Sequence, residues 1–537
     1  MSAAAAAASV PSPLDDRKPF ARHRPAPRRA RGNRPVSLSL SKAAALAEQG
    51  TQLPAFVRDE LDGYLACGLL SRGFRLLRCE SCHESQLVAF ACHGRGFCPS
   101  CLGRRTAQTA ANLVEHVLSP AVPLRQWVVT FPHPLRSRLA YDGELLGRVG
   151  RIVSDSLLGL YRRRMALEGF ARGRSGALNV VQRVSSDMKL APHHHVLALD
   201  GVYTQGSDGE LAFHALPRLR TDEVADVLQT IRIRVVRLLE RRGMLDGPDG
   251  EHAQLTLRSD DALSDSEPVL ARLAQTAVGT QPPAGPELRR RLAEVPLPGR
   301  PGFTVAGSLC VAEQGFSLHA ATRASAHDEA ARERLIRYVL RPPLATERLR
   351  LLDDELVRLE LKKPFSDGTW AIDLDPLSLL WRLCAAVPPP RRHTVVYSGV
   401  LSSHAKWRPR VVPAPTPSSE TGATTTTRTA PAPAAATAAE SPTSQPRCRR
   451  RSRAELLRQS FGHDPMLCPS CGGKLRLHAV VQNPASIRRI LRARGEPTEP
   501  PLLSPARGPP YWKTHVMRRK ADAPADRFDE QRDLFHA

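Results

Sequence analysis

The chain of 537 residues lacks the features that would place it in a membrane or among secreted, disulfide-rich proteins. No stretch reaches the roughly 18 to 20 apolar residues that a spanning helix needs. The Ala-rich start has no basic segment and is interrupted by Pro11, so we expect no signal peptide. Eleven unevenly placed cysteines are too few for a disulfide scaffold, and their pairing favours metal binding in an intracellular protein.

Acidic residues are scarce relative to basic ones. There are 77 Lys and Arg against 53 Asp and Glu, which gives a formal net charge of +24 and a pI near 10.3. Charge of this size promotes binding to a polyanion and carries no information about the fold. Nucleic acid is therefore the expected partner, and a basic membrane-surface protein is the alternative. Hydrophobic residues make up 42% of the chain, which is enough for a sizeable core.

Composition and periodicity divide the chain into six parts. Two of them have no core-forming content: a basic arm rich in Ala, Pro and Arg, and a linker rich in Thr, Ala and Pro, both expected to be disordered. The predicted order is the basic arm at 1–40, a zinc-binding, DNA-binding domain at 41–120, a mixed α/β domain at 121–410, the linker at 411–447, a basic C-terminal module at 448–497 and a polar tail at 498–537.

Hydrophobic periodicity within the mixed domain predicts alternating helices and strands. The predicted strands are 126–131, Leu178–Val184 and His193–Leu199, a hairpin spans Phe303–Arg323, and the predicted helices are 142–168, 222–242 and Glu329–Arg341. The last helix is expected to stop at Pro342 and Pro343, because proline cannot continue a helix.

Two CxxC pairs, separated by fifteen residues, predict a structural zinc site. Cys79, Cys82, Cys98 and Cys101 have the spacing of a four-thiolate site, although unligated buried thiols remain the alternative. Cys92, His83 and His93 lie between the pairs and could each replace one ligand. The nearby Arg95, Arg104 and Arg105 are expected to contact phosphates.

A single further pair, Cys468 and Cys471, predicts half of a second zinc site. Completing it would need another ligand, for which Cys448, His463 and His478 are the candidates near in sequence. The alternative is a half-site that binds no metal.

A histidine triplet follows Pro192 and leads into an apolar strand. Residues i and i+2 of a strand point to one face, so His193 and His195 could bind one divalent ion. Gln182 is the one polar residue in the apolar row of the preceding strand and is a third candidate ligand. A His-rich turn, or imidazoles bonded to backbone carbonyls, would explain the same string.

Tyr338 is the candidate nucleophile because it lies near Arg337 and Arg341 at the end of a predicted helix. A phenol beside arginines at a helix end can reach a phosphate. Ala331, Leu335 and Val339 share its helical spacing, so a core tyrosine is the alternative.

Several strings together resemble the rolling-circle transposases of the insertion sequence ninety-one family and the common-region elements. They are FCPSCLGRR, GALNVVQRVSSDMKLAPHHHVLALDGVY, GFSLHAATRASAHDEAARERLIRYVLRPPLATERL, LKKPFSDGTWAIDLDPLSLLWRLCAAVPPPRRHTVVYSGVL and FGHDPMLCPSCGGKLRLHAVVQNPASIRRIL. The resemblance covers about residues 45–410 and 450–495. It implies an α+β fold in which a zinc-ribbon-like domain precedes a His–hydrophobic–His nuclease with a central antiparallel sheet and flanking helices.

The resemblance also implies an activity. His193 and His195 match the ligands of Mg²⁺ or Mn²⁺, with Gln182 as the candidate third ligand, and Tyr338 matches the nucleophile. His194 departs from the usual apolar middle residue, and Pro342 stands where some members have a second tyrosine. The implied protein is a bacterial, cytoplasmic, nucleoid-associated transposase. It nicks and rejoins single-stranded DNA through a 5′-phosphotyrosine.

Related enzymes and an inactive protein are the alternatives. A rolling-circle replication initiator or a relaxase would use the same residues, and a zinc-dependent DNA-binding protein would keep the cysteines and charge without cutting. No GxxxxGK[ST] string is present, so we expect no nucleotide cofactor. The sequence specifies neither the target nor the oligomeric state.

Overall fold

The structure, a computed structural model, describes residues 53–245, 295–344, 346–352, 356–361, 364, 368–390, 393–413, 466–499 and 515–518. The predicted basic arm and most of the predicted linker and tail lie outside these ranges. The described residues belong to two compact units. Within these ranges, no helix is both long enough and apolar enough to cross a membrane.

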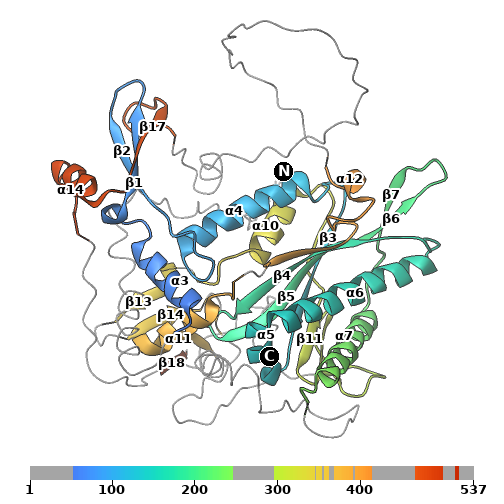
Figure 1. The fold of residues 1–537 in the computed structure, drawn as a ribbon. Helices are drawn as coiled ribbons and strands as arrows, with labels where there is room; N and C mark the ends of the chain where they lie inside the picture. The colour runs from blue at the N-terminus through green and yellow to red at the C-terminus, as the bar shows by residue number, and fades with distance from the viewer. Residues whose placement is uncertain are drawn as a thin grey trace, which may run out of the picture. The chain divides into compact units, whose positions relative to one another are not determined.

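The smaller unit combines two segments that are far apart in the sequence, residues 66–92 and 466–499. Its elements are the 3-10 turn η1 (Leu70–Arg72), the strands β1 (Phe74–Cys79), β2 (Ser85–Ala89) and β17 (Leu475–Val481), and the helix α14 (Pro484–Ala493). The strands pair antiparallel in the order β17-β1-β2, shown in blue and orange-red in Figure 1. The sequence places these two segments in separate predicted domains, at 41–120 and 448–497, and does not predict that they form one unit.

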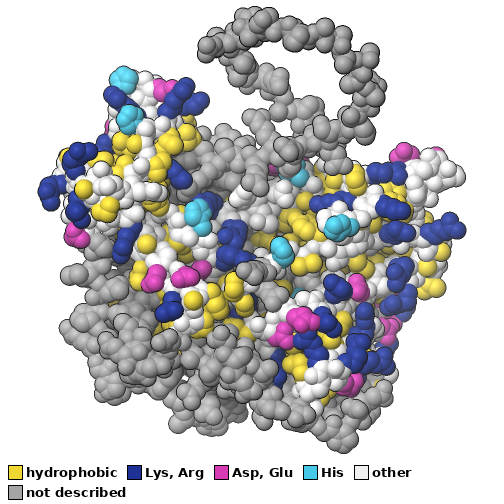
Figure 2. Space-filling view, in the orientation of Figure 1, with side chains coloured by type: hydrophobic (Ala, Val, Ile, Leu, Met, Phe, Trp, Pro, Cys, Tyr) yellow, Lys and Arg dark blue, Asp and Glu magenta, His cyan; other side chains and the backbone are white. Residues whose placement is uncertain are grey.

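Helix α14 closes a small apolar core on this sheet. Phe74 of β1 packs with Val481 of β17 and with Ile487 and Leu491 of α14. The helix begins at Asn483, whose side-chain oxygen accepts hydrogen bonds from the first-turn amides and so satisfies donors that lack a helical partner. The unit is basic, with nine Lys or Arg against four Glu among its described residues. Figure 2 shows these basic side chains gathered over β1, β17 and α14.

The larger unit is built on a sheet whose neighbouring strands are all antiparallel in the described residues. Its order is β16 (Val395–Gly399), β4 (Gly176–Val184), β5 (Leu190–Leu199), β3 (Leu124–Thr130), β11 (Phe316–His319), β10 (Cys310–Glu313), β9 (Phe303–Gly307) and β8 (Val295–Pro296), with β12 (Arg323–Ala324) paired to β3. A hairpin and a second antiparallel sheet complete the strands: β6 (Gly201–Gln205), β7 (Leu211–Ala215), β13 (Leu349–Leu351), β14 (Val357–Glu360), β15 (Thr369–Leu374) and β18 (His515–Arg518).

The helices of the larger unit cover both faces of the central sheet. They are α3 (Ala55–Ala66), α4 (Pro99–His116), α5 (His133–Tyr141), α6 (Gly143–Leu167), α7 (Thr221–Arg241), α10 (Glu329–Val339), η2 (Thr346–Arg348), α11 (Pro376–Ala386) and α12 (Arg408–Val411). Figure 1 shows α6 and α7 side by side on one face, with α4 and α10 on the other.

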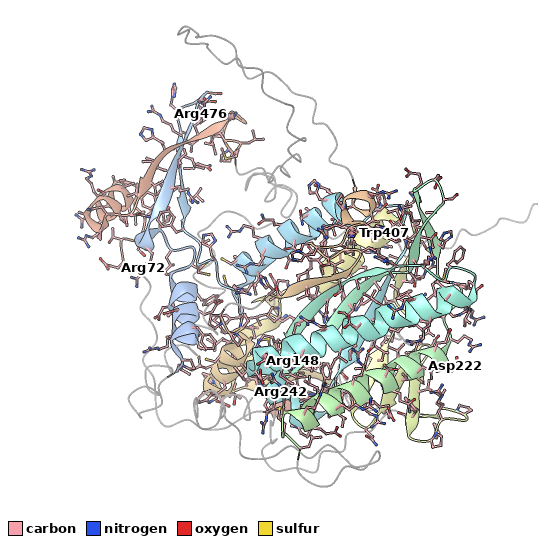
Figure 3. All side chains as sticks on the ribbon, turned by 45° about the vertical axis from the view of Figure 1, so that its right-hand side comes forward. Arg72, Arg148, Asp222, Arg242, Trp407 and Arg476 are labelled. Atoms are coloured by element: carbon pink, nitrogen blue, oxygen red, sulfur yellow. The ribbon has the colours of Figure 1, made fainter. Side chains whose placement is uncertain are left out.

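The same arrangement appears in the two apolar cores. Trp127 and Val129 pack with residues of α6 and α7, whereas Leu178 and Leu197 pack with α4 and α10. Charged groups also join α6 to the end of α7: Glu144 lies 2.8 Å from the guanidinium groups of both Arg148 and Arg242, which Figure 3 labels. These pairs are largely exposed, so we assign them little stabilisation.

The predicted α+β class with a central antiparallel sheet is confirmed. The predicted strands correspond to β3, β4 and β5, the hairpin contains β10 and β11, and the predicted helices correspond to α6, α7 and α10. Helix α10 ends at Val339, shortly before Pro342, as expected from the loss of the proline N–H.

Candidate histidine–tyrosine site and cysteine metal centres

The two outer histidines of the triplet lie on the sheet face that α10 covers. His193 is directly opposite Gln182, and His195 is directly opposite Val180 on the neighbouring β4. The imidazole centroids of His193 and His195 are 5.0 Å apart, and both side chains are buried. The structure therefore brings the three predicted ligands to one place on one face.

The middle histidine faces the other way and is structural. His194 Nδ1 lies 2.7 Å from the side-chain oxygen of Asn179, and the ring packs edge-on to Phe131. A Cβ at Gly150 of α6 would come within 3.1 Å of His194 Cε1, so the ring lies against that helix. A polar middle residue is tolerated here because the Asn179 side-chain oxygen accepts a hydrogen bond from Nδ1 of His194.

Hydrogen bonds set which nitrogen of each outer histidine can bind a metal. His193 Nδ1 lies 2.7 Å from the carbonyl oxygen of Ala191, which only accepts, so Nδ1 carries the proton and Nε2 the lone pair. His195 Nδ1 lies 2.8 Å from the amide nitrogen of Gln126. That amide donates to Nδ1. If the Gln126 side-chain amide turned by half a turn, its oxygen would accept a hydrogen bond from Nδ1–H instead. Nε2 would then carry the lone pair and could bind an ion.

Burial keeps this pair neutral. Burial, together with the nearby Arg341 and Arg136, lowers the pKa of His193 to about 4. Burial also lowers the pKa of His195 well below its ordinary value. Neutral imidazole is the form that binds metals.

Tyr338 lies on α10 beside the histidines. Its ring centroid is 5.9 Å from that of His195, and the guanidinium carbon of Arg341 is 4.3 Å from the Tyr338 centroid. Burial raises the pKa of Tyr338, and Arg341 opposes the shift. The side chain is half-buried, between a core position and solvent.

Hydrogen bonds to the last carbonyls of α10 fix the position of this tyrosine. Gln182 Nε2 donates to the Val339 oxygen at 2.9 Å, and the Thr106 hydroxyl donates to the Leu340 oxygen at 2.7 Å. The final carbonyls of a helix have no partner within the helix, so neighbouring elements must supply donors. Gln182 thus links the histidine strand pair to the tyrosine helix, while its side-chain oxygen can still face an ion.

A pocket rich in arginine adjoins this site. Its lining includes Gln182 and five arginines: Arg95, Arg105, Arg183, Arg341 and Arg348. None of the described residues that line it is Asp or Glu. Arg105, Arg183 and Arg348 donate to backbone carbonyls, which hold a guanidinium without neutralising it. Burial lowers the pKa of Arg105, and the like charge of the neighbouring Arg95 lowers it as well.

Two of the arginines predicted to bind DNA are placed differently. Arg104 lies 2.8 Å from the ring nitrogen of His93, and Arg337 is paired with Glu333 one turn earlier on α10. Neither lines the pocket. Sequence reasoning also missed Gln126, although it is a polar residue in the strand Gln-Trp-Val-Val-Thr.

Eight of the ten described cysteines form two groups of four, and neither group is the predicted set. Sulfur atoms lie within 4.8 Å of one another in a first group of Cys67, Cys92, Cys98 and Cys101 and in a second of Cys79, Cys82, Cys468 and Cys471. The predicted partners Cys79 and Cys98 thus belong to different groups. Cys92, one of the expected substitutes, is a member of the first. His478 belongs to neither, and Cys448 and His463 lie outside the described residues.

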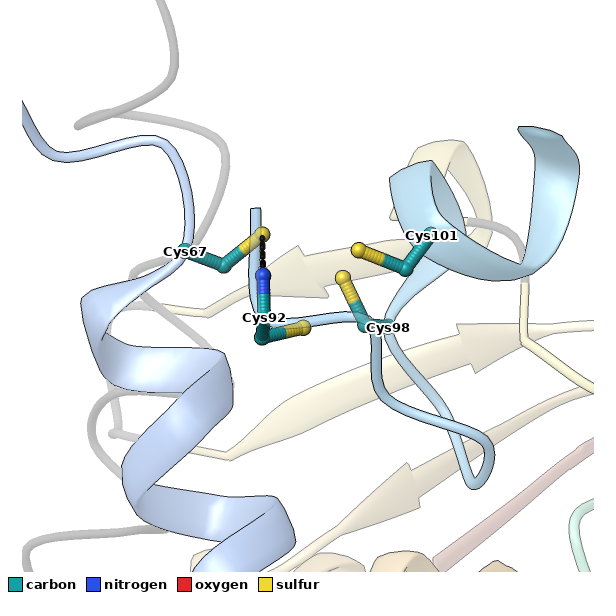
Figure 4. Close-up of side chains that lie close together, drawn as sticks. All are labelled: Cys67, Cys92, Cys98 and Cys101. Atoms are coloured by element: carbon teal, nitrogen blue, oxygen red, sulfur yellow. Dashed lines mark hydrogen bonds between the residues drawn. The ribbon is translucent and has the colours of Figure 1, made fainter. Parts of the chain in front are cut away.

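The first group has the local structure of a thiolate site (Figure 4). The Cys92 amide donates to the sulfur of Cys67 at 3.5 Å, and Cys98 and Cys101 lie at the start of α4. Amide hydrogen bonds and a helix N-terminus both stabilise a thiolate. Four convergent sulfurs suit structural zinc and leave no position for a substrate.

Comparison with known families agrees with these features. A model described as a transposase zinc-binding domain matches residues 40–131, and one described as a putative transposase matches residues 176–408. The first match contains the six N-terminal cysteines of the two groups, and the second contains His193, His195 and Tyr338. The protein is a DNA-processing transposase with structural zinc. It belongs to the insertion sequence ninety-one family of transposases. No curated protein and no solved structure matches the chain.

Proposed function

We propose that this transposase is a metal-dependent endonuclease and strand transferase. It would nick and rejoin single-stranded DNA at the ends of a mobile element and so drive rolling-circle transposition. The observation that carries the proposal is the 5.9 Å separation between the rings of Tyr338 and His195. This distance brings a phenol to a buried, neutral histidine pair under a guanidinium group.

His193, His195 and the side-chain oxygen of Gln182 would hold Mg²⁺ or Mn²⁺. When bound, such an ion supplies Lewis-acid polarisation of the scissile phosphate. The histidines fit this task because their pKa values are lowered, so no proton has to leave them at neutral pH. Because all three ligands are neutral, the charge of the ion would remain available to the phosphate.

Tyr338 would carry the covalent step. Its phenol oxygen forms a bond to phosphorus and releases its proton to water, while the bond from phosphorus to the 3′ oxygen breaks. That oxygen takes up a proton and leaves as a free 3′-OH, with the 5′ phosphate on the tyrosine. A later 3′-OH reverses the exchange and joins a new end, so no nucleotide cofactor is consumed. Arg341, over the ring, stabilises the developing phenolate.

The arginine pocket would hold phosphates next to the scissile one. It shares Gln182 and Arg341 with the histidine–tyrosine site, so a strand lying across both would keep its phosphates near the guanidinium groups of the pocket. The basic smaller unit would add contacts that do not depend on base sequence.

A covalent-adduct assay tests this function. Full-length protein is mixed with single-stranded oligonucleotides bearing element ends and Mn²⁺, and adducts that survive denaturant are counted. The wild type should form an adduct, and Tyr338→Phe and His193→Ala should not. Tyr397→Phe is the matched control, because Tyr397 also lies under a guanidinium, that of Arg408 at 5.3 Å.

Each other outcome would oppose part of the proposal. An adduct that persists in Tyr338→Phe would move the nucleophile to another side chain. Tight DNA binding by the wild type without any adduct would favour a DNA-binding protein that does not cut.

A further inference from the structure

The second cysteine group unites ligands from opposite parts of the chain. Cys79 Sγ is 3.5 Å from Cys471 Sγ, and Cys82 Sγ is 3.6 Å from Cys468 Sγ, across sequence separations of 392 and 386 residues. Zinc–sulfur bonds of about 2.3 Å in a tetrahedron place sulfurs about 3.8 Å apart. The observed separations are close to this value, so the four residues fit the ion.

The two CxxC pairs have the same local structure. The amide after the second cysteine donates to the carbonyl of the first, from His83 to Cys79 at 3.1 Å and from Gly472 to Cys468 at 2.8 Å. Both donors adopt left-handed backbone, with φ of 60° and 71°. The amide of each first cysteine donates to the carbonyl oxygen five residues further on, which is that of Glu84 for Cys79 and that of Gly473 for Cys468. The group therefore consists of two equivalent zinc knuckles that face each other.

The contact between the knuckles is close enough to require glycine. A Cβ at Gly473 would lie 2.5 Å from Ser81 Oγ and 3.0 Å from Cys79 Sγ. The Glu80 amide also donates to the carbonyl of Lys474 at 3.0 Å. Backbone complementarity of this kind indicates a built site, because four cysteines that met by chance would not need a missing side chain between them.

The adjoining sheet holds the knuckles in register. β1 leads into the first knuckle and β17 leaves the second, and these strands pair so that Cys79 lies opposite Leu475. Leu77 and Leu475 pack with Cys79 and Cys468 in one small buried cluster. Cys79 and Cys468, the first cysteine of each knuckle, are thus buried, which excludes water from two of the four sulfurs.

We propose that Cys79, Cys82, Cys468 and Cys471 form a split structural zinc site that fastens residues 466–499 to the N-terminal zinc-binding domain. The C-terminal module is then the second half of the ribbon. The matched family domain ends at residue 131, so it contains only half of these ligands. The site has four thiolates and no open position, so its role is structural. This inference is independent of the nuclease chemistry proposed above.

Zinc content of the full-length protein tests the inference. We expect two zinc ions per chain in the wild type, one for each cysteine group. Cys468→Ser with Cys471→Ser should lose one ion, and Cys79→Ser with Cys82→Ser should lose the same one. The decisive variant carries all four substitutions and should still retain one ion, since both pairs bind a single metal. Cys384→Ala, a buried cysteine outside both groups, is the matched control and should keep two.

Two results would overturn the proposal. Two ions in Cys468→Ser with Cys471→Ser would show that the tail supplies no ligand, and no ion in the fourfold variant would show independent sites. A wild-type measurement guards against misfolded variants. During stepwise chelation, alkylation should reach Cys79, Cys82, Cys468 and Cys471 together, whereas early modification of the tail cysteines alone would contradict a shared ion.

Discussion

The hydrogen bond between Gln126 and His195 allows a direct test of the histidine pair. Gln126→Leu introduces an apolar side chain of similar size and removes the amide group that lies 2.8 Å from His195 Nδ1. In the half-turned orientation that frees Nε2, the Gln126 oxygen accepts from Nδ1 and holds the proton there, and without that acceptor the imidazole has no reason to keep its proton on Nδ1. Nε2 then competes for the proton that a metal must displace. We therefore expect Gln126→Leu to weaken metal binding although it touches no metal.

The expected size follows from the position of the bond. Loss of such a supporting partner typically costs about 10- to 100-fold in metal affinity, or roughly 1.4 to 2.7 kcal/mol. Both Gln126 and His195 are buried, so the ring nitrogen cannot turn to water. The free energy of unfolding should therefore fall as well, by about 1 to 3 kcal/mol.

The assay is a Mn²⁺ titration of adduct yield, paired with thermal unfolding. Asn179→Leu is the matched control, because it removes the 2.7 Å partner of His194 on the opposite face of the same strand. Both variants should lose stability, but only Gln126→Leu should raise the Mn²⁺ midpoint. Equal shifts in the two variants, or a midpoint within twofold of wild type in Gln126→Leu, would refute the reasoning.

Two further predictions concern charge. Arg105→Gln should weaken binding of single-stranded DNA and reduce the slope of log affinity against log salt concentration by about 1. Arg337→Gln, which lies outside the pocket and is paired with Glu333, should change this slope less. Equal effects of the two substitutions would contradict the pocket as a phosphate site. The second prediction concerns His319, whose pKa burial lowers to about 4, from about 6.5 in the unfolded chain. The contribution of neutral His319 to the free energy of unfolding is therefore fully present above pH 6.5 and is lost as the pH falls towards 4. Full protonation of this one residue would lower the free energy of unfolding by about 3 kcal/mol. The melting temperature of His319→Leu should therefore fall less between pH 7 and 4.5 than that of the wild type or of the exposed control His404→Leu. An equal fall in all three would show that His319 does not contribute to acid destabilisation.

Much of the fold of the larger unit could be predicted because the information for it is local. The alternation of apolar residues in Leu178–Val184 and His193–Leu199 determines which side chains share a face, and a short loop restricts the strands to an antiparallel pair. The observed pairing of His193 with Gln182 follows directly. Gln126 could not be selected in this way, because its role depends on which strand lies on the other side of β5, and that neighbour is set by tertiary packing.

The arginines show the same limit. Proximity to a cysteine pair or to Tyr338 selected Arg104 and Arg337, yet one bonds to His93 and the other to Glu333. Arg183 and Arg348 belong to the pocket because β4 and η2 meet there in space. A long, flexible side chain can reach many partners, so its sequence position constrains its contacts weakly.

The cysteine error has a physical cause that the sequence does contain. Cys-Pro-Ser-Cys occurs twice, at 98–101 and at 468–471, and the two copies adopt different structures. Leu102 continues α4, whereas Gly472 turns left-handed, as His83 does after Cys82. The residue that follows the second cysteine therefore distinguishes a helix-starting pair from a knuckle. On that criterion Cys79 and Cys82 resemble the distant tail pair more than the neighbouring one, so like knuckles pair with like even when hundreds of residues separate them.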